Sequence, residues 1–277
     1  MPEGHTIHRL ARRHKRLFAG APVRASSPQG RFEAGAAAID GLVLRRTDAH
    51  GKHLFHDYGD RWLHVHLGLY GTFTDGAGDP PAPRGQIRLL LTGGRLRRGV
   101  LAPAWAELRG PTACEVLDDP ARDALLARLG PDPLRADADP ALAWERIGRS
   151  RTSIGALLMR QDVLSGVGNV YRAEALFRAG IDPYRAGRDL TVDEWNAVWD
   201  DLVVLMADGV RLGRILTLRP EDKKRATDPI GSGPQRDRGV GRYVYHRTGR
   251  PCRICGTPVQ TSVVEARNLY WCPVCQK

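Results

Sequence analysis

Long hydrophobic runs are missing from this sequence. No apolar stretch approaches the roughly 20 residues that a membrane-spanning helix needs, and the first residues lack the apolar segment of a signal peptide. We therefore expect a soluble protein of the cytoplasm with no membrane partner. Acidic residues are also in deficit, since 31 Asp and Glu face 42 Lys and Arg and leave a net charge of +11. This excess predicts a polyanionic partner, above all nucleic acid; the alternative is a GC-rich genome whose codons favour arginine.

Cysteine is scarce, with five residues in a chain of 277. A chain this long has room for two domains and a sizeable core, so it needs no disulfide framework. Four of the five form the pairs Cys252-x-x-Cys255 and Cys272-x-x-Cys275. This spacing predicts one structural zinc ion held by four thiolates, with no open position for chemistry; the alternative is a chance grouping of free thiols. Cys114 stands alone and is expected to be a buried apolar thiol.

The first part of the chain has the pattern of a mostly β domain. Residues 2–18 are predicted to form a helix with one apolar face among basic residues. Residues 61–67 alternate between apolar side chains and histidines, which is typical of a half-buried strand. Further extended runs are predicted at 41–46, 52–58, 86–92 and 95–102. Hairpin turns are predicted at two glycine-containing pairs, Gly59-Asp60 and Gly93-Gly94.

The pattern becomes helical after a Pro- and Asp-rich segment at 130–140. Helices are predicted at 141–148, 153–164, 169–180 and 190–213. The last of them has Thr191 followed three residues later by Glu194, which is the pattern of a capping box. Residues 219–242 are polar, glycine-rich and mostly basic, and we expect a long flexible loop. The chain then closes with the cysteine module.

Two basic or amide-rich positions are candidates for binding phosphate. The turn SGVG at 165–168 leads into a helix, so the backbone amides of Gly168 and Asn169 would lie at the positive end of its dipole. Arg267 precedes the second cysteine pair, where a zinc-braced hairpin could present it to a nucleic-acid groove. The alternatives are an ordinary glycine turn between helices and a solvated surface arginine.

The first residues, MPEG, combine a nucleophile with an acid. Once Met1 is removed, Pro2 carries a free secondary amine, and an α-amine has a reference pKa of about 8, low enough to attack a carbon at neutral pH. Glu3 beside it could donate a proton to a leaving group. The alternative is that Met-Pro begins the chain by chance.

Taken together, these motifs resemble the formamidopyrimidine-DNA glycosylase/endonuclease VIII family of bifunctional base-excision enzymes. The N-terminal PEG, the lysine in GKHLF, the helix–SGVGN–helix stretch and the CxxC pairs occur in the family's order from residue 2 to residue 277. The pairs Leu69-Tyr70 in HLGLYG and Tyr270-Trp271 in LYWC are more similar to endonuclease VIII than to formamidopyrimidine glycosylase. The resemblance implies an α+β architecture with four parts. These are a catalytic β-sandwich domain with a flanking helix, a linker with a short helix, a helix–two-turn–helix domain and a four-cysteine zinc finger with a β-hairpin, at 1–125, 126–150, 151–240 and 241–277.

The resemblance also implies roles for single residues. Pro2 would attack C1′ of the damaged nucleotide and form an imine, and Glu3 would act as general acid and base. Lys52 and Arg267 would complete the catalytic set by binding phosphate near the lesion. The implied DNA-binding residues are the apolar wedge that fills the hole left by the flipped base, a phosphate ligand and a glutamate near the site: Leu69 and Tyr70, Asn169, and Glu174.

The sequence departs from the family pattern at Thr6, where many members carry a second glutamate, so turnover here could differ. The loop at 219–242 shows no clear purine pocket, so we expect oxidised pyrimidines to be preferred among damaged bases. Histidines recur on the predicted strands at 53, 56, 64 and 66; surface side chains are the favoured interpretation over a second metal site.

The overall hypothesis is a monomeric, nucleoid-associated DNA glycosylase and abasic-site lyase. It would act on damaged double-stranded DNA and cleave the strand by β,δ-elimination. One alternative is a non-catalytic zinc-finger protein that binds DNA damage. Another is a transcription factor. An intact Pro2-Glu3 start argues against the damage-binding protein, and the wedge candidates and the lack of an evident dimer seam weaken the transcription factor.

Overall fold

The computed structural model describes residues 2–97, 100–225 and 241–277. By its internal contacts the chain divides into two compact units, Met1–Arg128 and Leu129–Lys277. Within the described residues no helix is both long enough and apolar enough to span a membrane. The prediction of helix over 2–18 is confirmed by α1, Gly4–Phe18.

Helix α1 is amphipathic. Its buried residues include Ile7, Ala11, His14 and Phe18, which recur every three or four positions and so lie on one face. The rest of the helix is strongly basic. Its exposed cationic side chains are Arg9, Arg12, Arg13, Lys15 and Arg16.

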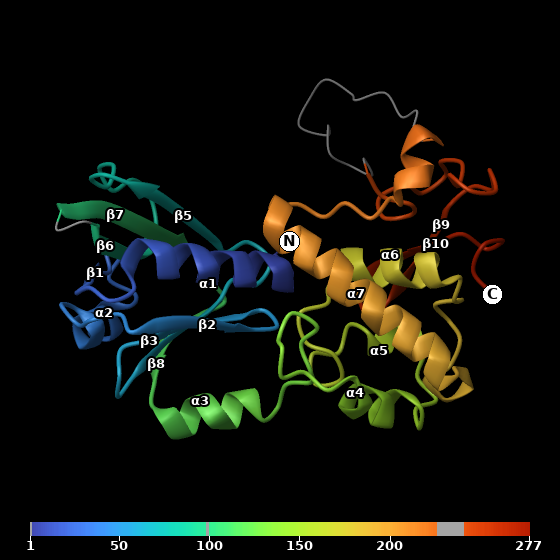
Figure 1. Cartoon of the computed structure of the whole chain (residues 1–277), viewed down its shortest axis with the longest axis horizontal. Helices are drawn as coiled ribbons and strands as arrows, with labels where there is room; N and C mark the ends of the chain where they lie inside the picture. The colour runs from blue at the N-terminus through green and yellow to red at the C-terminus, as the bar shows by residue number, and fades with distance from the viewer. Residues whose placement is uncertain (1, 98–99, 226–240) are drawn as a thin grey trace. The chain divides into compact units, whose positions relative to one another are not determined.

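Two antiparallel four-stranded sheets form the body of the first unit (Figure 1). One has the order β2-β3-β4-β8, with bounds Arg46–His50, His53–Asp57, Trp62–His66 and Ala113–Leu117. The other has the order β1-β6-β7-β5, with bounds Arg24–Ser26, Ile87–Arg97, Val100–Arg109 and Thr72–Ala77. Both sheets bury side chains in one core with α1 and α2 (Glu33–Ile39). Two sheets over a shared core confirm the β-sandwich. Helix α3 (Asp119–Leu126) follows β8.

Two strand predictions need correction. The strand predicted at 41–46 is wrong up to residue 45. The backbone at 41–44 pairs with residues 20–23, and β2 begins only at Arg46. The pair Gly93-Gly94 is not a hairpin turn either. Strand β6 runs through it to Arg97, which pairs with Val100 on β7. A side chain at Gly94 would collide with the Ala102 carbonyl, so this glycine serves close strand approach. The Gly59-Asp60 turn is confirmed, since the amide of Tyr58 donates to the Arg61 carbonyl at 3.0 Å.

The second unit is helical up to its zinc finger. Its helices are α4 (Pro140–Ile147), α5 (Ile154–Leu157), α6 (Asn169–Ala179) and α7 (Val192–Leu212), with short 3₁₀ helices at Gly187–Asp189 and Pro220–Arg225. They share one hydrophobic core. The predicted capping box of α7 is confirmed: Glu194 N donates to Thr191 Oγ1 at 3.2 Å, and Thr191 N donates to Glu194 Oε2 at 2.8 Å.

The predicted helix over 153–164 is wrong beyond Leu157. The chain continues in tight turns, in which Arg160 N donates to the Leu157 carbonyl and Val163 N to the Arg160 carbonyl. The Gln161 carbonyl accepts from Gly130 N, so the tertiary fold bends the segment where its apolar pattern would allow a helix. Most of the predicted loop at 219–242 lies outside the described residues. The chain ends with the hairpin of β9 (Gln260–Val264) and β10 (Arg267–Trp271).

Candidate active site and zinc centre

Pro2 and Glu3 lie directly before α1. Pro2 is half-buried, and the Glu3 side chain is completely buried. Glu3 is the N-cap residue with an extended backbone, and its carbonyl accepts a hydrogen bond from Thr6 N at 2.9 Å. The first turn of the helix therefore places the nitrogen of residue 2 directly before a residue with a buried carboxyl group, at the positive end of a helix dipole.

Lys52 lies in the two-residue turn between β2 and β3. Gly51 before it has a φ of +57°, and His50 pairs with His53 across the turn. Lys52 is close to His66 at the end of the next strand: burial above all, and then the charges of His64 and Lys52, lower the pKa of His66. This end of the sheet thus carries a lysine among imidazoles that are kept neutral.

Leu69 and Tyr70 lie on the turn that joins β4 to β5. Their side chains are 54% and 83% exposed, so neither is buried in the core. The turn needs glycine on both sides. Gly68 has a φ of +67° and a side chain there would collide with Thr112, while a side chain at Gly71 would come within 2.2 Å of the Leu67 carbonyl oxygen. The two glycines therefore permit a tight turn on which two large apolar side chains point away from the core.

The interpretation of the strand histidines as surface residues is wrong. His56 and His64 are almost completely buried, and His53 and His66 are half-buried. His56 faces the core, where its Nε2 lies 3.0 Å from Nδ1 of His14 on α1. His64 faces the opposite side of the sheet and bonds to Glu115 and His53. Among the described residues these histidines are not part of any group spaced to hold a metal ion.

Asn169 begins α6 as predicted, with Gly168 as an extended N-cap residue. Its side chain is 7% exposed, and its Oδ1 accepts a hydrogen bond from Arg172 Nη2. Glu174, one turn further on, is completely buried. Its carboxylate accepts from the backbone amides of residues 243, 244 and 245 at 2.7, 2.8 and 2.8 Å and from the Thr217 hydroxyl. These contacts favour a role in positioning residues 243–245 over a direct contact with DNA.

The four paired cysteines lie together in the second unit. Their sulfur atoms are all within 4.8 Å of one another, with 3.8 Å between Cys252 and Cys275 and 3.5 Å between Cys255 and Cys272. Tetrahedral zinc with Zn–S bonds of about 2.3 Å needs sulfur atoms about 3.8 Å apart, so the set fits one ion. The Thr257 hydroxyl is the main cause of a Cys255 pKa lowered to about 6, which favours the thiolate that zinc binds.

Arg267 is the first residue of β10. It pairs with Val264, so the hairpin turn consists of Glu265 and Ala266, both with positive φ. A two-residue turn of this kind matches the twist of the strands it joins. Arg267 is exposed beside the tip of a hairpin whose base is fixed by the cysteines.

Comparisons with known proteins cover all parts of the chain. Residues 1–99 match the formamidopyrimidine-DNA glycosylase N-terminal domain, residues 129–219 its H2TH domain, and residues 249–277 the zinc finger found in FPG and IleRS. Endonuclease 8 1 of Mycobacterium tuberculosis is 54% identical over 281 residues, which cover 100% of both chains. The chain belongs to the formamidopyrimidine-DNA glycosylase family. Formamidopyrimidine-DNA glycosylase of Thermus thermophilus is 33% identical over 100% of this chain and 98% of its own.

A solved structure shares the fold of this glycosylase-family chain. The complex between the Lactococcus lactis Fpg and an abasic site containing DNA aligns with a TM-score of 0.77 at 22% identity, over 99% of each chain. The predicted α+β architecture with a helix–two-turn–helix part and a zinc-finger hairpin is therefore confirmed.

Sequence analysis missed one residue of this glycosylase-family fold, Arg172. Its side chain is completely buried, yet it donates to the Gly155 carbonyl at 3.2 Å, to the Asn268 carbonyl at 3.0 Å and to Asn169. One guanidinium thus ties the start of α6 to the strand that carries Arg267. The available signal was a charged residue on a helix whose neighbours, from Val170 to Phe177, are otherwise mostly apolar.

Proposed function

We propose that this chain excises oxidised bases, pyrimidines in preference, from double-stranded DNA through a covalent imine on Pro2. Membership of the family makes it a DNA glycosylase with abasic-site lyase activity in base excision repair. The observation that supports the proposed chemistry most directly is the position of Pro2, half-exposed in front of a 15-residue helix and followed by a completely buried glutamate.

The proposed first step is attack of the Pro2 amine on C1′ of the damaged nucleotide. It requires removal of Met1, because an acylated proline nitrogen has no available lone pair. The bond between C1′ and the base then breaks, and Glu3 supplies the proton that the departing base or the opened sugar takes up. The positive end of the α1 dipole disfavours an additional positive charge at residue 2, which keeps an amine there in its nucleophilic form.

The iminium that results makes strand cleavage possible. It acidifies the C2′ proton, whose removal expels the 3′ phosphate in β-elimination. A second elimination expels the 5′ phosphate, and water then hydrolyses the imine and restores the amine. Each elimination breaks a carbon–oxygen bond and releases a phosphate, and the hydrolysis breaks the carbon–nitrogen bond of the imine, so no external oxidant or reductant is needed.

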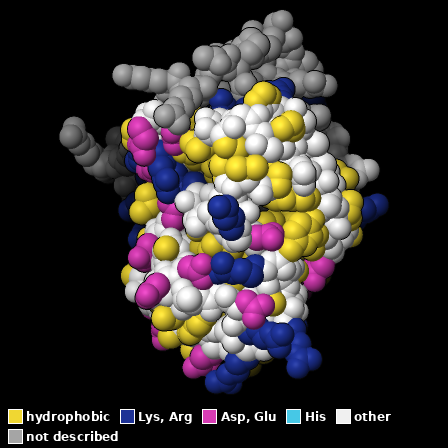
Figure 2. All heavy atoms as spheres, turned by 90° about the vertical axis from the view of Figure 1, so that its right-hand side faces the viewer, with side chains coloured by type: hydrophobic (Ala, Val, Ile, Leu, Met, Phe, Trp, Pro, Cys, Tyr) yellow, Lys and Arg dark blue, Asp and Glu magenta, His cyan; other side chains and the backbone are white. Residues whose placement is uncertain are grey.

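DNA would be held by contacts from both units. Lys52, Asn169 and Arg267 are placed on a turn, a helix start and a hairpin tip, where side chains or amides can bind phosphates without reading sequence. Leu69 and Tyr70 are exposed enough to fill the space of a flipped base. The basic face of α1 adds positive charge in the first unit. By contrast, Figure 2 shows acidic and basic side chains interspersed on the face of the second unit that it displays.

Borohydride trapping tests the proposal. Purified protein, with its N-terminus verified by mass, is incubated with duplexes that carry an abasic site, thymine glycol or 8-oxoguanine, and borohydride is added. We expect a reduced covalent complex with the abasic and thymine glycol duplexes and a weaker one with 8-oxoguanine. The complex should be lost in Pro2→Gly and in protein that retains Met1.

The same experiment distinguishes the proposed enzyme from a non-catalytic protein that binds DNA damage. Binding to all duplexes without any trapped complex would refute the imine and leave a damage-binding zinc-finger protein. Equal or stronger trapping on 8-oxoguanine would overturn the pyrimidine preference alone. That the enzyme acts as a monomer at the nucleoid stays a prediction.

A further inference from the structure

The sheet β2-β3-β4-β8 carries a chain of hydrogen-bonded polar side chains on the face opposite its core residues. His64 Nδ1 lies 2.8 Å from an oxygen of Glu115, and His53 Nδ1 lies 2.9 Å from His64 Nε2. The alternation of strand residues explains the placement, because Leu54 and Val65 point into the core and their neighbours therefore point the other way. Three strands thus contribute one residue each to a carboxylate–imidazole–imidazole relay.

The contact between the two imidazoles is a hydrogen bond within the plane of the rings. The planes of His53 and His64 differ by 18°, and their centroids are 5.1 Å apart. Nearly parallel rings whose centroids are 5.1 Å apart and whose nitrogens are 2.9 Å apart must face each other edge to edge, because the nitrogens then lie almost on the line that joins the centroids. The ring of Phe55 lies 5.1 Å from that of His64 and helps to exclude water from it.

The relay determines which nitrogens carry protons. An ionised carboxylate can only accept, so His64 Nδ1 must be the donor to Glu115. A neutral His64 then presents a lone pair on Nε2, and His53 Nδ1 must donate to it. His53 is left with a lone pair on Nε2. Both imidazoles are therefore fixed as Nδ1–H tautomers, and the acceptor end of the relay is a residue adjacent to Lys52.

We propose that Glu115 and His64 are positioning residues that hold His53 with Nε2 as an acceptor at the Lys52 end of the sheet, and that the relay couples DNA binding there to the uptake of one proton. The positioning of His53 by Glu115 and His64 does not depend on bound DNA. The coupling to proton uptake rests on the proposed function, because it needs a DNA phosphate near Lys52.

Uptake of one proton at one end of the relay moves the positive charge to the other end. A proton from solvent adds to His53 Nε2, and the Nδ1 proton of His53 passes to His64 Nε2. His53 is then neutral again, and the positive charge resides on His64 beside the Glu115 carboxylate, which stabilises it. In the free protein the relay is neutral: burial above all, and then the neighbouring imidazoles and Arg128, lower the pKa of His53 to about 3. A phosphate near Lys52 brings a negative charge that favours the protonated form.

The groups around the relay show why a bound anion would matter. Cations and imidazoles outnumber carboxylates there. The groups that face His53 and His64, or lie in the adjoining row, are His50, Lys52, His66, Arg122 and Arg128 against Asp48 and Glu115.

Nitrogen-15 spectroscopy tests the tautomers in the zinc-loaded full-length protein. Long-range ¹H–¹⁵N correlation of labelled histidines distinguishes Nδ1–H from Nε2–H imidazoles. We expect His53 and His64 as Nδ1–H, with signals assigned by their loss in His53→Gln and His64→Gln. Glu115→Gln should keep the His64 tautomer, because the glutamine carbonyl still accepts. An Nε2–H tautomer at His64 in the wild type would overturn the relay.

The pH dependence of DNA binding tests the proton linkage. The dissociation constant for a duplex with a tetrahydrofuran abasic analogue is measured from pH 7 to pH 5 at constant ionic strength. One linked proton tightens binding by at most about tenfold per pH unit. Because the free relay takes up its proton only far below pH 7, we expect binding of the wild type to tighten as the pH falls by less than this limit, and by clearly less still in Glu115→Gln and His64→Gln.

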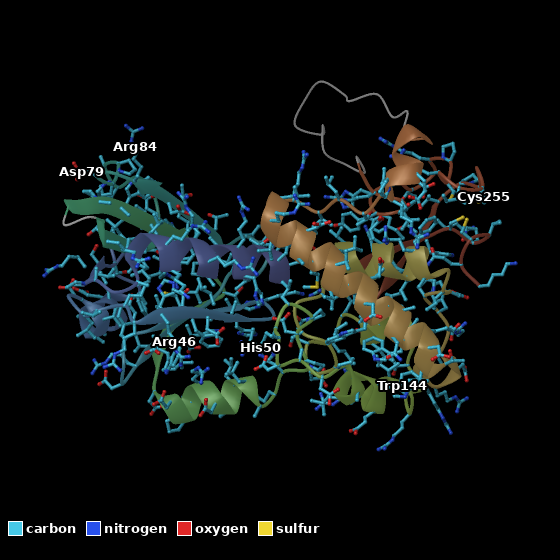
Figure 3. All side chains as sticks on the ribbon, viewed as in Figure 1. Arg46, His50, Asp79, Arg84, Trp144 and Cys255 are labelled. Atoms are coloured by element: carbon cyan, nitrogen blue, oxygen red, sulfur yellow. The ribbon has the colours of Figure 1, made fainter. Side chains whose placement is uncertain are left out.

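Asp79→Asn is the matched control, because it removes the same charge from the same unit and should keep the wild-type slope. Figure 3 shows Asp79 and His50 far apart in the first unit. Equal slopes in the wild type and both relay variants would refute the coupling. An unchanged affinity in Lys52→Gln would instead refute the proposed phosphate contact, while the spectra still decide the tautomers.

Discussion

The buried carboxylate of Glu174 makes the sharpest stability prediction. One of its oxygens accepts from the amides of Val244 and Tyr245, and the other from the amide of Tyr243 and the Thr217 hydroxyl. Glu174→Gln preserves the shape but replaces one oxygen with a donor. The Thr217 hydroxyl can rotate to accept, whereas a backbone amide cannot, so at least one buried N–H loses its partner.

The magnitude follows from these contacts. A buried N–H without a partner costs about 1–3 kcal/mol, and each remaining bond weakens by about 1 kcal/mol when its acceptor loses its charge. Two such bonds bring the loss to about 3–5 kcal/mol. At about 1.4 kcal/mol per tenfold change, local opening of residues 243–245 should become at least about a hundredfold more frequent.

Hydrogen–deuterium exchange of zinc-loaded protein measures this opening directly, since the three amides are the groups that the carboxylate protects. Peptides that span 243–245 should exchange at least about a hundredfold faster in Glu174→Gln. Glu145→Gln, on the exposed side of α4, makes the same chemical change and should leave them as in the wild type. Exchange within a few-fold of the wild type in Glu174→Gln would show that the carboxylate does not hold this segment.

Three further predictions concern the wedge, the metal and pH. Leu69→Ala with Tyr70→Ala should reduce single-turnover base excision at least about tenfold yet change the free energy of unfolding by less than about 0.5 kcal/mol, because both side chains are exposed; a large loss in urea stability would contradict this. Cys255→Ser, or chelation, should reduce bound zinc below one equivalent and weaken duplex binding, as metal analysis and anisotropy would show; intact binding without zinc would argue against a structural ion. Burial lowers the pKa of His14 to about 3 from 6.5, so the stability it contributes is complete above pH 6.5 and is lost as pH falls below it, by up to about 1.4 kcal/mol per pH unit. Urea unfolding at pH 7 and pH 5.5 would reveal the loss, and a flat profile would refute neutral burial.

Features fixed by local chain geometry could be predicted from the sequence. The CxxC spacing places thiolates together wherever the module folds, the Thr191–Glu194 pattern acts within one helical turn, and the glycines around Leu69 restrict a single tight turn. The two residues within each CxxC pair, the Thr191–Glu194 box and the close approach of Gly71 to Leu67 each depend on residues within a few positions of one another. Tertiary packing can therefore do little to displace them.

Features that depend on what covers a strand or helix could not be predicted. Alternation placed His64 on the polar face of its strand correctly, but nothing in residues 61–67 tells that Phe55 and Glu115 flank His64 from the two neighbouring strands of that face. The pair Gly93-Gly94 is typical of a turn, and only its approach to Ala102 shows that it belongs inside a strand pair.

Helix α6 connects the proposed DNA contacts of the second unit. Its first residue is Asn169, its buried Arg172 binds the Asn268 carbonyl beside Arg267, and its buried Glu174 binds the amides of residues 243–245. A buried guanidinium bonds only to acceptors and a buried carboxylate only to donors, so the two residues satisfy opposite groups of distant backbone segments. Without such partners, burial of either charge would destabilise the fold, because removing a charge from water costs free energy that only hydrogen bonds to it can offset. The charges therefore explain how a short helix fixes both the zinc-finger hairpin and the segment before it, and why the proposed phosphate ligands Asn169 and Arg267 should move as one body.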